Sequence, residues 1–272
     1  MGVDAIAAPN TDFSVFRDGD ELTWQARQRV FGAMARLQIE RSRVASAVEH
    51  KQRVAARIVG RGRVGINRAI VQAAATWRVL ESVRHVGRPD QLKISLPNNA
   101  YFVEHGLRMT SVWSHSGVEP EARLMLSGED PTVYFFGFAP MQMKIIDGTS
   151  VLLDGPSLGG EPTVMEVRDA ATLAAARGYW DAVVATMFPC DTETAVLVDL
   201  TQRQRRIVTL MITASSDEQI AGKLGVSVRT VRADIAAVLS LLDAPNRFVA
   251  GLRLRERLGV PAPAATDGSA RG

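Results

Sequence analysis

Residues 200–247 constrain the fold more than any other part of the chain. Three short helical segments follow one another there, each with a start signal. The segments, with the hydroxyl residues expected to cap their first turns, are 202–213 after Thr201, 217–224 after Ser216 and 228–242 after Ser227. Gly225 follows the second segment, where glycine adopts the left-handed conformation at least cost. The pattern predicts two short helices joined by a tight turn, a helix-turn-helix.

The third segment, 228–242, presents two different faces. Val231, Ile235, Val238 and Leu242 keep helical spacing and should be buried. The side chains expected to face outward are Arg229, Arg232, Ala233 and Ala236. An arginine can bond a guanine edge through two hydrogen bonds, and an alanine can contact a thymine methyl group. We therefore expect this helix to enter the major groove of double-stranded DNA.

Other polar residues nearby are expected to hold the DNA backbone. Contacts of this kind fix the register of a protein on the duplex without reading sequence. The candidates are Thr201, Arg203, Arg206, Ser227, Thr230 and Arg247. The alternative is an ordinary helical bundle with a solvated basic face. Caps, turn glycine and charge agree with one another here, which favours DNA binding.

These residues resemble the C-terminal domain of LuxR-type (GerE-like) regulators. The match includes Leu200-Thr201-x-Arg203, Gln219-Ile220-Ala221, Leu224-Gly225-Val226-Ser227, Thr230-Val231-Arg232 and Asn246-Arg247. The resemblance implies a four-helix DNA-binding domain with Arg232 and Ala233 at base-reading positions and Thr230 at a phosphate. Three positions depart from the pattern. Gln204 replaces a common Glu, and Asp234 stands where His is frequent and would repel phosphate if it pointed outward. Leu241 replaces a usual Lys, and this change removes a phosphate contact.

The net charge of +3 is unevenly distributed along the chain. Residues 22–63 hold ten Arg or Lys against two Asp or Glu, and residues 200–260 hold ten against five. Residues 64–199 hold ten against sixteen. Positive charge at the two ends suits a polyanionic partner, while the acidic middle has another role.

Other features of the chain favour a cytoplasmic protein. The single cysteine, Cys190, excludes an intramolecular disulfide framework. The N-terminus lacks the pattern of a signal peptide, and no apolar run is long enough for a membrane helix.

Residues 22–59 read as one long basic helix. Val30, Met34, Leu37, Val44 and Val48 belong to a heptad series that Arg41 and Lys51 interrupt. This seam predicts either a coiled coil that dimerises the protein or a helix packed on its own domain. If the seam does not dimerise, the last helix of the DNA-binding domain, 246–258, is the better candidate interface.

Residues 60–190 are expected to form an α/β domain that senses an effector. The predicted helices are 66–82 and 169–187, and the predicted strands are 92–96, 109–113, 132–138, 143–146, 150–154 and 163–167. Asp147-Gly148 reads as a hairpin turn.

This middle region resembles half of a phospholipase D-like domain, as found in TrmB-like regulators. The resemblance rests on residues 106–113 and 139–148. The enzymes place His-x-Lys five residues before an Asp. Aligned on Asp147, the His position holds Pro140 and the Lys position holds Gln142. Without that nucleophile and that cation the resemblance implies a domain that has lost the reaction.

Two glycine motifs and the histidines do not indicate an enzyme. Residues 155–159 fit G-x-S-x-G, but a strand follows them and all four histidines precede them, so we interpret the segment as a turn. Residues 60–65 fit G-x-G-x-x-G, which we interpret as a hinge because a predicted helix precedes it. The histidines are scattered, so we expect no metal and no other cofactor.

The sequence therefore predicts a multidomain, dimeric, non-enzymatic transcription regulator. The expected domains are a flexible 1–21, a helix 22–59, an α/β domain 60–190, a linker 191–199, a helix-turn-helix domain 200–260 and a disordered tail 261–272. Expected partners are double-stranded DNA and a second copy, with RNA polymerase as a further candidate and the effector ligand unknown. The alternatives are a phosphodiesterase or hydrolase with an accessory DNA-binding module, and a regulator whose middle domain binds a protein.

Overall fold

The computed structural model describes residues 21–192, 199–212 and 216–257, and contacts within the chain define two compact units. The first, α/β, unit takes in the chain up to Glu119 together with Asp130–Cys190, and the second, helical, unit takes in Pro120–Glu129 and the chain from Asp191 onward. The predicted flexible N-terminus, most of the predicted linker and the predicted disordered tail lie outside the described residues. No helix in the described part of the chain is long and apolar enough to cross a membrane.

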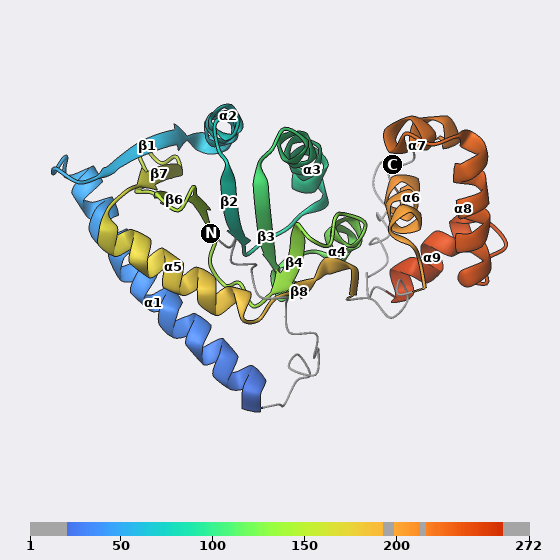
Figure 1. Cartoon of the computed structure of the whole chain (residues 1–272), viewed down its shortest axis with the longest axis horizontal. Helices are drawn as coiled ribbons and strands as arrows, with labels where there is room; N and C mark the ends of the chain where they lie inside the picture. Colours follow the sequence, from blue (N-terminus) through green and yellow to red (C-terminus); the bar gives the residue numbers. More distant parts are fainter. Residues whose placement is uncertain (1–20, 193–198, 213–215, 258–272) are drawn as a thin grey trace, which may run out of the picture. The chain divides into compact units, whose positions relative to one another are not determined.

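The α/β unit is built on a mixed sheet of eight strands (Figure 1). The strands are β1 (Ala56–Arg61), β2 (Val79–Arg84), β3 (Arg108–Ser114), β4 (Tyr134–Gly137), β5 (Met143–Ile146), β6 (Ser150–Asp154), β7 (Thr163–Val167) and β8 (Phe188–Pro189). Their order is β1-β7-β6-β5-β2-β3-β4-β8. The central β2, β3 and β4 are parallel, and the other neighbours pair antiparallel.

Two long helices, α1 (Glu21–Glu49) and α5 (Ala170–Val184), pack together over one face of this sheet (Figure 1). Leu37 of α1 and Tyr179 of α5 are fully buried in the core that the helices share with the sheet. The helices α2 (Gly62–Ala74) and α3 (Pro89–Glu104) lie on the other side. A short 3-10 turn, His115–Gly117, also belongs to this unit, and a second one, Cys190–Thr192, begins at the unit's last residue.

The predicted N-terminal helix is shorter than expected and does not form a domain of its own. It ends at Glu49 because Lys51 adopts a positive φ of 54° and the Gln52 N–H bonds back to the Ala47 carbonyl, as at a Schellman end. The following residues form the edge strand β1 instead of a helix. The heptad seam is buried against α5 and the sheet, as the second reading of the seam expected.

Two other sequence predictions in the α/β unit were wrong. The expected helix 66–82 begins earlier and stops at Ala74, and Val79–Arg84 is the central strand β2. The expected strand 92–96 lies inside helix α3. There Leu92 and Leu96 are buried while Ile94 is 65% exposed. The buried side chains therefore recur every four residues, as in a helix, and not every two residues, as in a strand.

The glycine-containing turns of the α/β unit differ in how well they were predicted. Asp147 and Gly148 both have positive φ values, of 52° and 66°, and form the expected hairpin turn between β5 and β6. The G-x-S-x-G segment is a turn before β7, as expected. The G-x-G-x-x-G segment is not a hinge between the long helix and the α/β domain, because its first two residues belong to β1 and its last four begin α2.

The helical unit contains α4 (Pro120–Ser127), α6 (Gln202–Ile212), α7 (Asp217–Leu224), α8 (Val228–Leu241) and α9 (Arg247–Arg257). The three helices predicted over 202–242 are therefore confirmed to within about one residue. One core cluster joins α6 to α7 and α8 through Ile207, Ile220 and Val231. A second cluster includes Leu124 of α4, which sequence analysis placed in the α/β domain.

Candidate nucleic-acid interface

The start of each helix in the helix-turn-helix is fixed by local hydrogen bonds. Ser216 and Gln219 form a capping box, in which the Gln219 N–H donates to Ser216 Oγ over 3.2 Å and the Ser216 N–H donates to Gln219 Oε1 over 2.9 Å. Thr201 and Gln204 make the same reciprocal pair at the start of α6. Glutamine at position 204 therefore supplies the acceptor that the common glutamate would supply.

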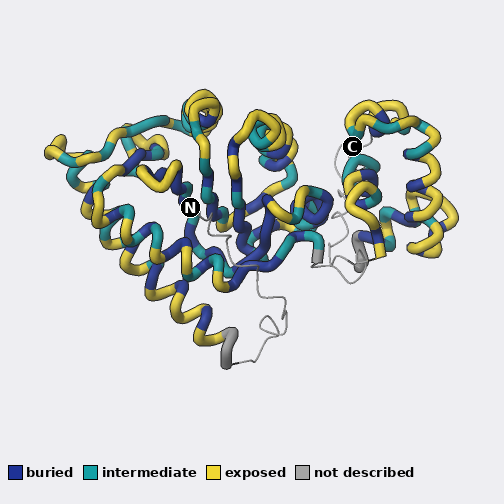
Figure 2. Tube along the Cα trace, viewed as in Figure 1, coloured by how far each residue is buried: buried dark blue, intermediate teal, exposed yellow. Residues whose placement is uncertain are grey.

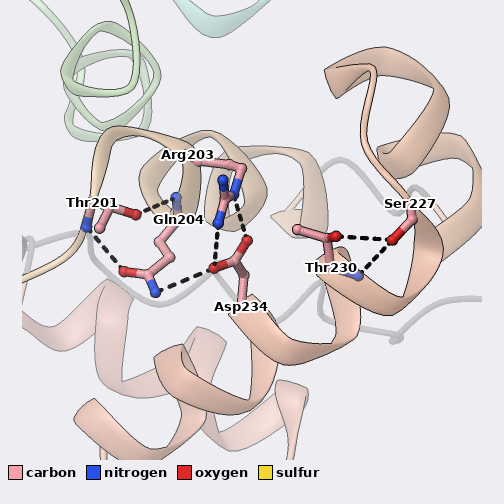
Figure 3. Close-up of polar contacts among 6 residues, drawn as sticks. All are labelled: Thr201, Arg203, Gln204, Ser227, Thr230 and Asp234. Atoms are coloured by element: carbon pink, nitrogen blue, oxygen red, sulfur yellow. Dashed lines mark hydrogen bonds and ion pairs between the residues drawn. The ribbon is translucent and has the colours of Figure 1, made fainter.

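The turn between α7 and α8 has the predicted geometry. Gly225 ends α7 with φ 65° in the left-handed region. Two residues later Ser227 caps α8, because its Oγ accepts the Thr230 N–H over 3.1 Å (Figure 3). The Ser227 and Thr230 hydroxyl oxygens are also 2.8 Å apart. Both hydroxyls are thus partly engaged within the cap that was expected to meet a phosphate.

The outer face of α8 carries the side chains that sequence analysis placed there. Val231 and Ile235 are buried against α6 and α7, and Val238 is buried in the second cluster with Val208 of α6. The residues expected to face outward, Arg229, Arg232, Ala233 and Ala236, are all exposed. This side of α8 appears in the exposed colour in Figure 2. In the described part of the chain Arg229 forms no ion pair.

Arg232, the expected base-reading residue, is bound to the start of α7. Its Nε lies 3.0 Å from Asp217 Oδ2, and a second nitrogen lies 3.8 Å from Glu218 Oε1. Arg247 of α9 contacts the other oxygen of Asp217 at 2.6 Å. The hydrogen bonds from Arg247 and then Arg232 lower the pKa of the Asp217 carboxyl. Arg232 nevertheless remains 65% exposed, so its guanidinium can still reach another molecule.

Two arginines expected to contact the DNA backbone are also paired inside the unit. Arg203 donates to Asp234 through two nitrogens, at 2.6 and 3.3 Å (Figure 3). Asp234 is only 7% exposed, so it does not face outward as a charge that would repel phosphate. Arg206 lies 4.0 Å from Glu129, the residue that closes the 120–129 segment.

Sequence reasoning missed the carboxylates that hold these arginines. Asp217 and Asp234 lie on α7 and α8, fifteen and thirty-one residues from their partners Arg232 and Arg203. A pairing at such separations depends on how the helices pack, and no local pattern gives it. The one available signal was the position of Asp217 directly after the cap Ser216, where an acidic residue favours the helix N-terminus.

The described residues contain no group of three or more His, Cys, Asp or Glu side chains arranged to hold a metal ion. In the α/β unit, Asp147 Oδ1 accepts the backbone N–H groups of Arg78 and Val79 at 2.9 and 2.8 Å. This carboxylate therefore fixes the β5–β6 turn beside β2.

The comparison with known families agrees with the geometry. Residues 198–252 match the family model described as bacterial regulatory proteins, luxR family. No curated protein matches the chain significantly. The match covers all of α6, α7 and α8 and about half of α9.

Proposed function

We propose that this protein is a dimeric, sequence-specific transcription regulator that reads the major groove of DNA with α8, because residues 198–252 match the luxR family model. The observation that carries the proposal is the exposed outer face of α8, set directly after a left-handed Gly225 and the Ser227 cap. A helix presented in this way, with its first turns free of packing contacts on one side, fits the major groove of B-form DNA.

We propose that base reading is divided between Arg229 and Arg232. Arg229 lies on the first turn of α8 and is exposed, so it can approach a base edge without breaking an ion pair of the described residues. Arg232 is oriented by Asp217 and would exchange part of that contact for a guanine. Ala233 and Ala236 leave room for the helix to lie deep in the groove and can contact thymine methyl groups.

Phosphate contacts are proposed for the residues that surround this helix. The N-terminus of α8, with Ser227 and Thr230, presents backbone N–H groups and a positive helix dipole to an anion. Thr201 and Arg247 are exposed and complete the set. Arg203 and Arg206 are expected to contribute less than their charge suggests, because carboxylates of the same unit already face them.

For the dimer we propose α9 as the interface. The heptad seam of α1 is used inside its own unit. By contrast, Phe248 and Leu252 lie one helical turn apart on α9 and are 74% and 46% exposed, while Ala250 and Leu254 face the core. Two recognition helices related by a twofold axis would then contact two half-sites of one operator.

We propose a regulatory and non-catalytic role for the α/β unit. Pro140 and Gln142 stand where phospholipase D-like enzymes need a nucleophile and a cation, and Gln142 donates to Asp154 at 2.9 Å. The protein would act in the cytoplasm, on promoter DNA and with RNA polymerase as a further partner.

The test of DNA reading begins with footprinting of the protein on the DNA upstream of its own gene. Affinities for the protected sequence and for a scrambled duplex are then measured at several salt concentrations. Arg232→Ala should weaken operator binding by about 1–3 kcal/mol and leave scrambled DNA nearly unchanged.

Arg247→Ala is the matched control, because it removes the other arginine bound to Asp217. It should weaken binding to both DNAs similarly, as a phosphate contact would. If Arg232→Ala lowers both affinities equally, Arg232 contacts the backbone and the proposed placement of α8 is wrong.

The dimer is tested separately by sedimentation of the full chain. Phe248→Glu should shift the protein toward monomer, because it places a charge in the proposed α9 interface. Ile39→Glu, at a residue of α1 that is 68% exposed, is the control and should leave the oligomeric state unchanged. A dimer that survives Phe248→Glu and dissociates with Ile39→Glu would place the interface on α1.

A further inference from the structure

The two faces of the central sheet differ sharply in polarity. Toward α1 and α5 the strands present apolar residues such as Val83, Val112 and Ile145. The register aligns Ser82 of β2 with Ser111 of β3 and with Lys144 of β5, so these three polar residues share the opposite face. A polar row across the middle of a covered sheet has no role in packing the core.

A hollow lies over this polar face. One part has a volume of about 530 Å³ and a second of about 270 Å³, a size typical of small-molecule sites. Both parts are lined by Arg63, Asn67 and Ile70 of α2, Arg84 of β2 and Lys144 of β5, so they adjoin. We call this space the β2–β5 hollow. All of its lining residues belong to the α/β unit.

Hydrogen-bonding groups without partners gather around the β2–β5 hollow. Among the described residues, three buried side-chain N or O atoms have no hydrogen-bond partner: Arg84 Nε, Ser95 Oγ and Trp113 Nε1. All three residues line the smaller part of the hollow. Arg84 Nε and Trp113 Nε1 can only donate, and the Ser95 hydroxyl can do so. A buried donor without an acceptor is costly, so three around one space indicate an acceptor-rich occupant.

The charges at the hollow point to an anion. Lys144 Nζ donates to Ser82 Oγ at 3.0 Å and has no carboxylate partner in the described residues. The Arg84 guanidinium lies 5.1 Å from the centre of the Trp113 ring and also lacks an ion pair there. Burial, and then the charge of Arg84, lowers the pKa of Lys144 to about 7. The charge of Asp154, which lines the larger part of the hollow, favours the charged form of Arg84, but among the described residues it forms an ion pair with neither cation. A bound anion would therefore stabilise these two adjacent, largely desolvated cations.

The smaller part of the hollow adds an apolar wall. Trp77, Phe102 and Leu107 line it together with Trp113. These side chains can cover the flat apolar body of a ligand whose charged group lies between Arg84 and Lys144. Arg63, on the exposed surface of α2, can close over the same group from outside.

We propose that the β2–β5 hollow binds a small organic oxyanion with a flat apolar body, held by Arg84, Lys144, Ser95 and Trp113. The positions of this chain that align with the phospholipase D-like motif are 140, 142 and 147, and none of these four residues is among them. The site lies in the α/β unit, and its existence does not depend on how the helical unit reads DNA.

Phenyl phosphate and benzoate are suitable probes, because they carry the two common oxyanions on the same ring. Benzyl alcohol is the neutral control. Binding to the purified full chain is followed by titration calorimetry and by tryptophan fluorescence, since two of the four tryptophans, Trp77 and Trp113, line the hollow. At least one anion should bind and benzyl alcohol should not. Comparison of the two anions identifies which oxyanion the site prefers.

Arg84→Gln and Lys144→Met should each lower the affinity for the anion by about tenfold or more, because each removes a desolvated cation. Arg108→Gln, an exposed residue of β3 outside the lining, is the matched control and should change nothing. Lys144→Met removes a buried charge and should raise the melting temperature of the ligand-free protein. A loss of anion binding in this variant is then not caused by unfolding. Absence of binding by both anions, or equal binding by Lys144→Met, overturns the proposal.

Discussion

Arg203 and Asp234 form an ion pair of 2.6 Å between α6 and α8, and the Asp234 carboxylate is almost fully buried. Gln204 adds a hydrogen bond of 3.4 Å to the same carboxylate (Figure 3). The hydrogen bond that Arg203 donates to Asp234 raises the pKa of the Arg203 guanidinium, which therefore stays charged. The pair ties the first helix of the motif to the recognition helix at the position where LuxR-type sequences often have histidine.

Asp234→Asn tests whether this pair withholds Arg203 from DNA. The variant loses the carboxylate charge, so we expect a lower melting temperature and an Arg203 able to contact phosphate. The dependence of log affinity on log salt should then steepen by about one unit on scrambled DNA. An unchanged slope would show that Arg203 already contacts phosphate in the wild type or never reaches it. The double variant with Arg203→Ala separates these two cases.

Leu124→Ala should destabilise the helical unit, although the residue lies between two strands of the α/β sheet in the sequence. Leu124 is 1% exposed and belongs to the core cluster of Leu200, Val208 and Val238. Removing its buried methyl groups should cost about 2–5 kcal/mol. Glu121→Ala, on the same helix, is the control.

The two units can be followed separately during this experiment. All four tryptophans lie in the α/β unit, so fluorescence reports on that unit, whereas circular dichroism reports on both. Leu124→Ala should shift the helical transition seen by circular dichroism more than the fluorescence transition. A shift confined to fluorescence would place Leu124 in the α/β core instead.

The helical unit was predictable from sequence because its signals are local. Ser216, Gly225 and Ser227 act on the residues beside them, and the helices begin and end where these residues indicate. The outward residues of α8 follow directly from the helical period. The partners of Arg203 and Arg232 were not predictable, since they depend on how separate helices pack.

The α/β unit was less predictable because several of its segments fit two periods. Val79–Arg84 is a central strand between β3 and β5, and a strand buried on both faces has no alternation to distinguish it from a helix. The end of α1 was missed because Lys51 takes the left-handed position that glycine usually occupies. The β2–β5 hollow could not be inferred, since Arg84 and Lys144 meet only through the pairing of β2 with β5.

Ser216→Ala should cost about 1 kcal/mol of unfolding free energy, because it removes one half of the capping box at the start of α7. Urea denaturation followed by circular dichroism measures the difference. Ser240→Ala, at an exposed position of α8, is the matched control and should change stability by less than about 0.5 kcal/mol. Equal effects of the two substitutions would mean that the cap does not stabilise the folded domain.

Lys144 should make the stability of the α/β unit depend on pH. Its pKa is about 7 in the folded protein and about 10.5 in the unfolded chain. The charged groups around it in the hollow are Arg41 on α1, Arg63 on α2, Arg84 on β2, Asp90 on α3 and Asp154 on β6. Between pH 7 and pH 10.5 the unfolded chain binds more protons at this lysine than the folded protein does. The contribution of Lys144 to the free energy of unfolding therefore rises with pH in this range.

The rise should not exceed about 1.4 kcal/mol per pH unit, and it should be absent in Lys144→Met. Subtracting the unfolding free energy of the wild type from that of the variant removes, to first order, the contributions that the other titrating groups make to both proteins. The variant should therefore be the more stable protein at pH 7, with the difference shrinking as pH approaches 10. Fluorescence-detected urea denaturation at three pH values measures this trend. A constant difference would show that Lys144 keeps an ordinary pKa, and hence that solvent or a carboxylate reaches its ammonium group in the folded protein.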